Sequence, residues 1–300
     1  IASLSTLQSV LVVGSNLRKD HPLFAQRIRQ AARHGCQVIA LDSVERDWAI
    51  PVKHLLKHAA SQWVLALGGI AAAVAQEKGV AGPAGSFVID DAATAVARSL
   101  MAGERKAVLL GNAAAHHAQA TQLLALANWI GEHTGATVGY LTEAANTVGA
   151  QFVGAHPVKG GLNAAQMLSG GLKAVLLLNN EPVHDSSVGA RATDALSGAE
   201  MVVTLSPFKA NMEFSDVLLP IAPFTETSGS FINAEGRLQS FHAVVRPLGD
   251  TRPAWKVLRV LANMLEIAGF DFETSQDVLA RATNAAPGAF SRIDAAQLSN

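Results

Sequence analysis

Short apolar runs alternate with longer amphipathic stretches along the first half of the chain. Ser9–Val13 is an aliphatic run that ends at Gly14, and Gln37–Leu41 is a second run that ends at Asp42. Between them, Pro22 suits the first turn of a helix, and apolar residues then recur at helical spacing. Unbroken apolar runs of this length are typical of parallel strands that are buried on both faces. The pattern therefore predicts βαβ units.

The same alternation continues through the rest of the chain. Further strands are predicted at Trp63–Leu67, Lys106–Leu110, Thr137–Leu141, Ala174–Leu178, Met201–Leu205 and Asp216–Leu219, and further helices at Ile70–Lys78, Ala92–Met101, His117–Glu132 and Ala254–Ala268. The expected fold class is α/β, with two successive, mostly parallel αβα (Rossmann-like) units.

The most suitable domain boundary is the short polar segment 102–105. It divides the chain into a Rossmann-like unit over 1–104, a second α/β unit over 105–240 that carries a Glu-Gly-Arg loop, and a helical extension over 241–300. Residues 142–161 have few periodic signals, and a loop of that length in a compact domain is usually functional or packed on a partner. We therefore expect an interaction loop there.

Composition narrows the function classes. The 300 residues carry 23 basic and 24 acidic side chains, which argues against a strongly basic nucleic-acid binder. Aliphatic runs such as Val10–Val13 are far shorter than the ~20 residues that span a bilayer. We therefore expect neither a nucleic-acid partner nor direct membrane insertion. The chain begins at Ile1 without an initiator methionine, which suggests a piece of a longer polypeptide.

Candidate metal ligands are few. Cys36 is the single cysteine, so this chain alone can form neither an internal disulfide nor a four-cysteine zinc or iron–sulfur site. His54 and His58 are four residues apart, as metal ligands on a helix are, but Lys53 and Lys57 beside them would repel a cation. A solvated helical face is the favoured interpretation, and no metal site is predicted.

Two further histidine motifs do not indicate catalysis. His116 and His117 are adjacent, and adjacent helical residues point in different directions, so we interpret them as polar residues at a helix start. His184-Asp185 lacks an accompanying Gly-x-Ser-x-Gly nucleophile turn. No catalytic residue is predicted.

The turn at Gly14 offers the one candidate nucleotide site. It follows a predicted strand, at the edge of a parallel sheet where nucleotides commonly bind, and Asp42 ends the next strand, where a carboxylate can accept ribose hydroxyls. The turn lacks Gly-x-Gly-x-x-Gly, however, and Arg18 and Lys19 stand where further glycines are expected. A loop-capping role for Asp42 is favoured, with ribose binding left open.

The densest block of polar and glycine residues lies between 225 and 239. Its acidic, amide and basic side chains are candidates for a polar network across a loop, while its glycines allow backbone geometry closed to other residues. The members of this block are Glu226, Gly229, Asn233, Glu235, Gly236 and Arg237.

That block resembles a motif of the molybdopterin oxidoreductase superfamily, Glu-x-x-Gly-x-x-x-Asn-x-Glu-Gly-Arg-x-Gln. Two neighbouring segments agree with it: Asp216–Pro220 is similar to the superfamily's Asp-Val-x-Leu-Pro, and Arg252–Trp255 to its Arg-Pro-x-Trp. Near the start, Gly14–Pro22 is similar to its Gly-x-Asn-x-x-x-x-His-Pro loop. The resemblance covers Val10 to Leu265 and implies the α/β fold of that superfamily.

Within the superfamily, the sequence looks like the C-terminal part of the large iron–sulfur subunit (the 75 kDa subunit) of bacterial NADH:quinone oxidoreductase, complex I. Gly111-Asn112 and Ser206-Pro207-Phe208 support this branch. The resemblance implies a non-catalytic structural segment without its own cofactor. The parent complex moves electrons from NADH through iron–sulfur clusters to quinone, and clusters are expected in the upstream part of the subunit. Other hydrophilic-arm subunits would be the partners, on the cytoplasmic side of the inner membrane.

The alternative is a fragment of a molybdopterin-dependent enzyme of the formate dehydrogenase or nitrate reductase type, which binds a pterin dinucleotide. By resemblance, Gly14, Asn16 and Asp42 would be the inherited contacts, and in complex I they would be vestigial. The Asp-Pro-Arg run often seen in the cofactor-binding relatives is replaced here by Asp42–Arg46, Asp-Ser-Val-Glu-Arg.

Overall fold

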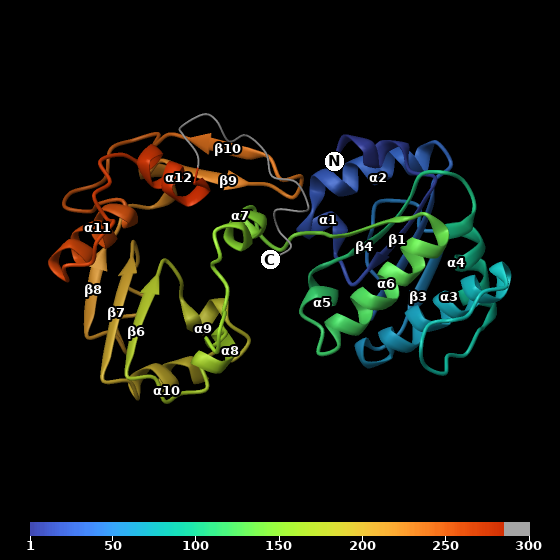
Figure 1. Ribbon diagram of the computed structural model, residues 1–300, viewed down its shortest axis with the longest axis horizontal. Helices are drawn as coiled ribbons and strands as arrows, with labels where there is room; N and C mark the ends of the chain where they lie inside the picture. Colours follow the sequence, from blue (N-terminus) through green and yellow to red (C-terminus); the bar gives the residue numbers. More distant parts are fainter. Residues whose placement is uncertain (285–300) are drawn as a thin grey trace. The chain divides into compact units, whose positions relative to one another are not determined.

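Two compact units make up the chain in the computed structural model, which describes residues 1–284 (Figure 1). Unit 1 is Ile1–Ala144, and unit 2 begins at Ala145. The predicted boundary at 102–105 is wrong, because the strand that follows it, β4 (Lys106–Leu110), pairs in parallel with β1 (Ser9–Val13). The residues of that strand are buried, so this segment belongs to the centre of unit 1.

Unit 1 is built on a five-stranded sheet in the order β3-β2-β1-β4-β5, with every neighbouring pair parallel. Its elements are η1 (Ala2–Thr6), β1, α1 (Leu17–Asp20), α2 (Pro22–Arg33), β2 (Gln37–Asp42), β3 (His54–Lys57), η2 (Ala60–Gln62), α3 (Trp63–Lys78), α4 (Asp91–Met101), β4, α5 (Asn112–Ala115), α6 (Ala120–Thr134) and β5 (Thr137–Tyr140). The prediction of an α/β fold with parallel sheets is confirmed.

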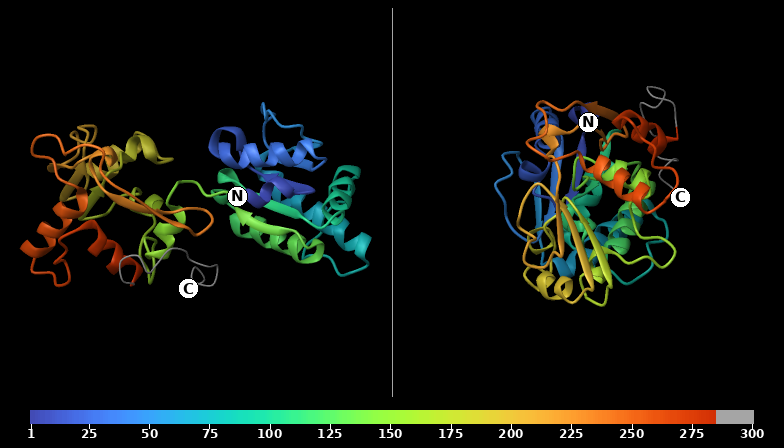
Figure 2. Two further views of the ribbon diagram at one scale, coloured as in Figure 1. Left: turned by 90° about the horizontal axis from the view of Figure 1, so that it is seen from above. Right: turned by 90° about the vertical axis from the view of Figure 1, so that its left-hand side faces the viewer.

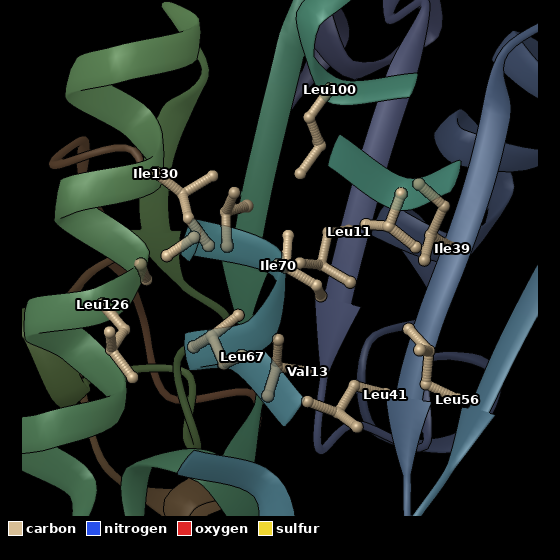
Figure 3. Packing of buried hydrophobic residues seen from close by; sticks show 14 of the residues in the cluster. Leu11, Val13, Ile39, Leu41, Leu56, Leu67, Ile70, Leu100, Leu126 and Ile130 are labelled. Atoms are coloured by element: carbon tan, nitrogen blue, oxygen red, sulfur yellow. The ribbon is translucent and has the colours of Figure 1, made fainter. Parts of the chain in front are cut away.

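Helices cover both faces of this sheet, as Figure 2 shows from above. Val10 and Val12 of β1 face α2, while Leu11 and Val13 face the helices α3, α4 and α6 (Figure 3). Successive strand residues point to opposite faces, so a strand that is covered on both sides must be apolar throughout. This is why the strands are visible in the sequence as unbroken aliphatic runs.

Two sequence-based predictions in unit 1 are wrong. Trp63–Leu67, expected as a strand, forms the first turns of α3, whose residues are apolar on nearly every side and therefore show no helical period. His54 and His58 do not share a helical face, because His54 begins the edge strand β3 and His58 follows it.

Unit 2 contains a three-stranded parallel sheet, β6-β7-β8, and an antiparallel pair, β9-β10. Its elements are α7 (Thr147–Phe152), α8 (Ala164–Met167), β6 (Ala174–Leu178), α9 (Pro182–Asp185), α10 (Arg191–Ser197), β7 (Met201–Ser206), β8 (Val217–Pro220), η3 (Phe224–Glu226), β9 (Gly229–Ile232), β10 (Leu238–Phe241), α11 (Ala254–Met264) and α12 (Ser275–Thr283). The predicted loop 142–161 contains α7. The predicted extension 241–300 carries α11 and α12, and its residues 285–300 lie outside the described part of the chain.

The β6-β7-β8 sheet buries one face more completely than the other. Leu177 and Val202 lie in a small core with Leu196 of α10. On the opposite face, Leu176 is 50% exposed, and its register partner across β7, Val217, is 40% exposed. Parallel sheets are normally covered on both faces. Unit 2 therefore presents apolar sheet surface to its surroundings.

In the described part of the chain, none of the helices combines the length and the apolar character needed to cross a membrane.

Replacement of Gly14 by alanine is expected to destabilise unit 1 more than replacement of Gly79. Both glycines have left-handed backbone, with φ of +63° and +65°, so both substitutions carry the same backbone strain. A Cβ at Gly14 would lie 2.6 Å from Trp63 Cζ3, whereas a Cβ at Gly79 would meet nothing within 4 Å. We expect G14A to lose about 1–3 kcal/mol more unfolding free energy than G79A. Urea unfolding followed by tryptophan fluorescence measures both losses, and equal losses would contradict the packing argument.

Cys36 is expected to be unreactive in the folded chain. The side chain is buried in the cluster around α2 and β2, and this burial raises the pKa of the thiol from 9.0 to about 11. The reactive thiolate is therefore scarce below that pH. At pH 8 we expect Ellman's reagent to label the folded chain at least ~10-fold more slowly than the urea-unfolded chain. Equal rates in the two states would contradict the burial argument.

Candidate functional site

The candidate site lies where the strands of unit 1 end. In the order β3-β2-β1-β4-β5, chain connections leave β1 and β4 in opposite directions, and such a switch point is where doubly wound folds bind ligands. The structure brings Gly14, at the end of β1, and Asp42, at the end of β2, to this common edge. Gly111, at the end of β4, joins them there.

Asp42 is fully engaged within the chain. Its Oδ1 accepts hydrogen bonds from the Ser43 and Val44 amides at 2.7 and 3.4 Å and from Arg46 Nη2 at 3.3 Å. Its Oδ2 accepts one from Arg46 Nε at 2.7 Å, and the residue is 1% exposed. These hydrogen bonds to Asp42 raise the pKa of Arg46. The carboxylate thus caps its own loop and forms an ion pair with Arg46.

The loops after β1 and β4 are hydrogen-bonded to each other across the switch point. The Gly111 amide donates to the Val13 carbonyl at 2.8 Å, and the Ala113 amide donates to the Gly14 carbonyl at 3.0 Å. Glycine is required on both loops, because a Cβ at Gly111 would lie 2.3 Å from Ser15 Cβ. Hydrogen bonds and close packing thus hold the loops after β1 and β4 against each other.

Trp63 fills the remaining space beside Gly14. Its indole Nε1 donates to the His58 carbonyl at 3.1 Å, and the His117 ring stacks on it at a centroid distance of 5.8 Å. The sequence pattern did not reveal this role, because the segment around Trp63 was expected to be a strand. The role of Arg46 was also missed, because Arg46 follows Asp42 in a loop after β2, where no helical spacing relates the two side chains.

Two buried oxygen atoms at this edge have no hydrogen-bond partner among the described residues. They are Ser15 Oγ, just after β1, and Asn112 Oδ1, just after β4. Asn16 is the residue before the short helix α1, and its backbone amide donates to Asp20 at 3.1 Å. All three predicted residues, Gly14, Asn16 and Asp42, thus lie at this edge of the sheet. Gly14 packs against Trp63, and Asp42 forms an ion pair with Arg46, so both make contacts within the fold.

The histidine motifs have structural partners. His21 Nε2 lies 2.8 Å from the Thr142 carbonyl and ties the start of α2 to the segment after β5. His116 Nε2 lies 2.8 Å from Glu143 Oε2, both side chains being well exposed. In the His184-Asp185 pair, the aspartate accepts a hydrogen bond from the Glu181 amide at the start of α9. Within residues 1–284, no group of three His, Cys, Asp or Glu side chains is placed to hold a metal ion.

The motif block of unit 2 forms the turn between β9 and β10. Asn233 Oδ1 accepts hydrogen bonds from the Glu235 and Arg237 amides, each at 3.0 Å, and Gly236 takes a left-handed φ of +75°. Asn and Gly suit these two positions, because Asn can accept backbone hydrogen bonds within a turn and Gly adopts a left-handed φ without strain.

The remaining members of the block lie apart from that turn. Gly229 stands opposite Phe241, whose ring would lie 2.7 Å from a Cβ on the glycine. Glu226 reaches a different loop, where its Oε2 accepts a hydrogen bond from the Leu248 amide at 2.9 Å. Members of the block thus make loop contacts both in the β9-β10 turn and with the loop at Leu248.

Replacement of Arg46 by glutamine is expected to destabilise unit 1 by about 1–3 kcal/mol, because it leaves the buried Asp42 carboxylate with an uncompensated charge. The matched control is Arg18→Gln, since the Arg18–Asp47 pair has side chains 47% and 77% exposed. An exposed pair of this kind contributes roughly 0–1 kcal/mol. Denaturant unfolding compares the two variants, and an effect of R46Q no larger than that of R18Q would contradict the described role of Arg46.

The curated relatives of this chain carry the names of redox enzymes. A probable oxidoreductase of Bacillus subtilis strain 168, YjgC, is 39% identical over 75 residues, which are 25% of this chain and 8% of that protein. The putative formate dehydrogenase YrhE of the same strain is 29% identical over 134 residues, 43% of this chain and 14% of that protein. The chain thus spans a small part of the length of these relatives.

Solved structures share the fold at low sequence identity. Acetylene hydratase from Pelobacter acetylenicus superposes with a TM-score of 0.72 at 11% identity, over 97% of this chain and 51% of that one. A chain of the formyltransferase/hydrolase complex from Methylorubrum extorquens superposes with a TM-score of 0.60 at 16% identity, over 88% of this chain and 76% of that one. The family model for molybdopterin oxidoreductases matches residues 1–264. By this match over most of its length, the chain belongs to the molybdopterin oxidoreductase family.

Proposed function

We propose that this chain is a non-catalytic structural segment of a larger redox enzyme of its family, namely the large iron–sulfur subunit in the peripheral arm of NADH:quinone oxidoreductase. The observation that carries the proposal is the engagement of Asp42, the acid at the position where a dinucleotide's ribose would be recognised. Both of its oxygens already accept hydrogen bonds, with Arg46 bound on each.

The energetics of this edge favour a structural role. A ribose hydroxyl can bind Asp42 only by replacing charge-assisted hydrogen bonds from Arg46 with neutral ones, which are about half as strong. A loss of about 1–3 kcal/mol would lower the affinity for a nucleotide roughly 5- to 150-fold. The phosphate side of the crevice is also restricted, since the Ala113 amide already donates to the Gly14 carbonyl.

The redox centres of the proposed parent belong to its other parts. The only cysteine, Cys36, is buried in an apolar cluster with a raised pKa, which is unfavourable for a thiolate ligand. In this assignment, iron–sulfur clusters in the rest of the subunit carry electrons from NADH towards quinone, and this segment supports their surroundings.

The proposed partners are other hydrophilic-arm subunits, on the cytoplasmic side of the membrane. The partly exposed apolar face of the β6-β7-β8 sheet, with Leu176 and Val217, supports burial against a protein neighbour. We place the segment in the peripheral arm as a contact surface, with no direct insertion into the bilayer.

A second candidate is a segment of a formate dehydrogenase-type enzyme that holds part of a pterin dinucleotide. Sequence identity favours this candidate, because the putative formate dehydrogenase of Bacillus subtilis and one of Staphylococcus aureus, 42% identical over 59 residues, are among the relatives. The buried, unpartnered Ser15 Oγ and Asn112 Oδ1 also favour it, since both lie where a ligand would approach the strand ends. The comparisons thus favour the second candidate, and the engagement of Asp42 favours the first.

Titration of the full chain with GDP, as the nucleotide half of a guanine-containing dinucleotide, separates the two candidates. Isothermal calorimetry is expected to show no saturable binding of GDP to the wild-type chain. The same preparation is expected to contain neither molybdenum nor iron in stoichiometric amount by elemental analysis.

A control variant makes the titration decisive. Saturable GDP binding that is lost in Asp42→Ala, with the unfolding transition of unit 1 preserved, would overturn the structural assignment in favour of the formate dehydrogenase-type enzyme. Binding that is equal in wild type and D42A would overturn the role assigned to the edge as a whole.

A further inference from the structure

A groove in unit 2 combines an apolar wall with clustered positive charge. It lies between β8 and α11, encloses about 520 Å³, and is lined by Leu219 of β8 and by residues of α11 and its flanking loops. A volume of this size lies within the range of small-molecule sites. The apolar part of the lining includes Val257, Val260 and Met264, of which Val260 is 54% and Met264 78% exposed.

The groove is held in place by backbone pairing. Ile221, which follows β8, forms a parallel bridge with Arg252, and the Ala222 amide donates to the Arg252 carbonyl at 2.9 Å. Pro253 is the N-cap residue of α11, which begins at Ala254. The start of the helix is thereby fixed beside the end of the strand, so the groove is a built feature of unit 2.

Three cationic side chains line the groove against one carboxylate. Arg252, Lys256 and Arg259 are spaced by four and three residues, so that the last two lie on one face of α11. The carboxylate is Glu273, whose Oε1 lies 3.5 Å from Arg259 Nη2. Among the described residues, neither Arg252 nor Lys256 has an acidic partner within salt-bridge distance. The side chains that line the groove therefore carry a net positive charge.

Arg259 also carries an unsatisfied donor. Its Nε is buried and has no hydrogen-bond partner among the described residues, although the side chain as a whole is 29% exposed in the lining of the groove. Buried N–H groups are almost always paired in folded proteins. The Nε atom itself is covered, so a ligand in the groove would meet the exposed part of the Arg259 side chain.

We propose that this groove binds a small amphipathic carboxylate. The carboxylate group binds Arg259 and Lys256, and its apolar part lies along Val257, Val260 and Met264. Glu273 competes with the ligand for Arg259 and weakens the binding. The groove is lined by residues of unit 2 alone, and its existence does not depend on the function proposed for the chain.

Decanoate is the probe, titrated into the full chain below its micellar concentration. Calorimetry is expected to show one saturable site for decanoate, with binding at least ~10-fold weaker for decanamide, which has the same apolar chain without the charge. Equal affinity for the two compounds, or no saturable binding of decanoate, would overturn the proposal.

Variants locate the site on the chain. Arg259→Gln is expected to weaken decanoate binding at least ~10-fold, while Glu273→Gln strengthens it by removing the competing carboxylate. The matched control is Arg281→Gln, an exposed arginine on α12 outside the groove, which should bind as the wild type does.

Because Arg259 is partly buried, Lys256→Gln provides a second test at an exposed position. It is expected to weaken decanoate binding with only a small change in the thermal unfolding of unit 2, from loss of the Lys256 contact with the Trp255 ring. Wild-type affinity in folded R259Q or in K256Q, or equal weakening by R281Q, would overturn the assignment of the groove.

Discussion

The parallel pairing of β1 with both β2 and β4 is the constraint on which unit 1 depends. Every residue of β1 is buried, and its side chains alternate between the cluster under α2 and the cluster under α3, α4 and α6. Because all three strands run in the same direction, their last residues must lie at one edge of the sheet. The placement of Gly14, Asp42 and Gly111 side by side is a consequence of that pairing.

At that edge, side chains that face the strand ends make contacts within the fold. Arg46 neutralises the buried Asp42 carboxylate, and Trp63 occupies the space against Gly14. Each contact stabilises the fold and removes an acceptor or a volume from the crevice. A fold can persist while its site changes role, since the packing of strands and helices does not require a ligand at the switch point. The structural role that we propose rests on these contacts, which stabilise the fold without a ligand.

The two units differ in how completely they cover their sheets. In unit 1, both faces of β1 are shielded from solvent by helices of the same unit, whereas Leu176 and Val217 of unit 2 remain partly exposed. Unit 2 also presents the groove beside α11, where Arg259 lacks a partner for its Nε. Exposed apolar sheet surface and the groove beside α11 are therefore features of unit 2, whereas β1 of unit 1 is covered on both faces.

Much of the fold was predictable, because buried parallel strands appear in the sequence as unbroken apolar runs. The runs at β1, β2 and β4 were recognised, since strands covered on both faces must be apolar at nearly every position. The runs at β6 and β7 were recognised as well, although one face of their sheet is partly exposed. The helix α3 was partly missed for a related reason. Because α3 has apolar side chains on nearly all of its sides, its apolar residues do not recur with a helical period. The hydrophobic pattern of Trp63–Leu67 therefore could not be distinguished from that of a strand.

The sequence by itself determined the α/β class, the family motifs, the absence of a second cysteine, and the location of Gly14 and Asp42 at strand ends. Only the tertiary structure decided that the unit boundary follows Ala144, that Trp63 closes the space beside Gly14, and that Leu219 and Arg259 line one groove. These features join residues that are distant in the chain. The hydrophobic period of a segment indicates whether it is a helix or a strand and which of its faces is buried. The contacts that close a crevice or form a groove arise only after segments distant in the sequence have packed together.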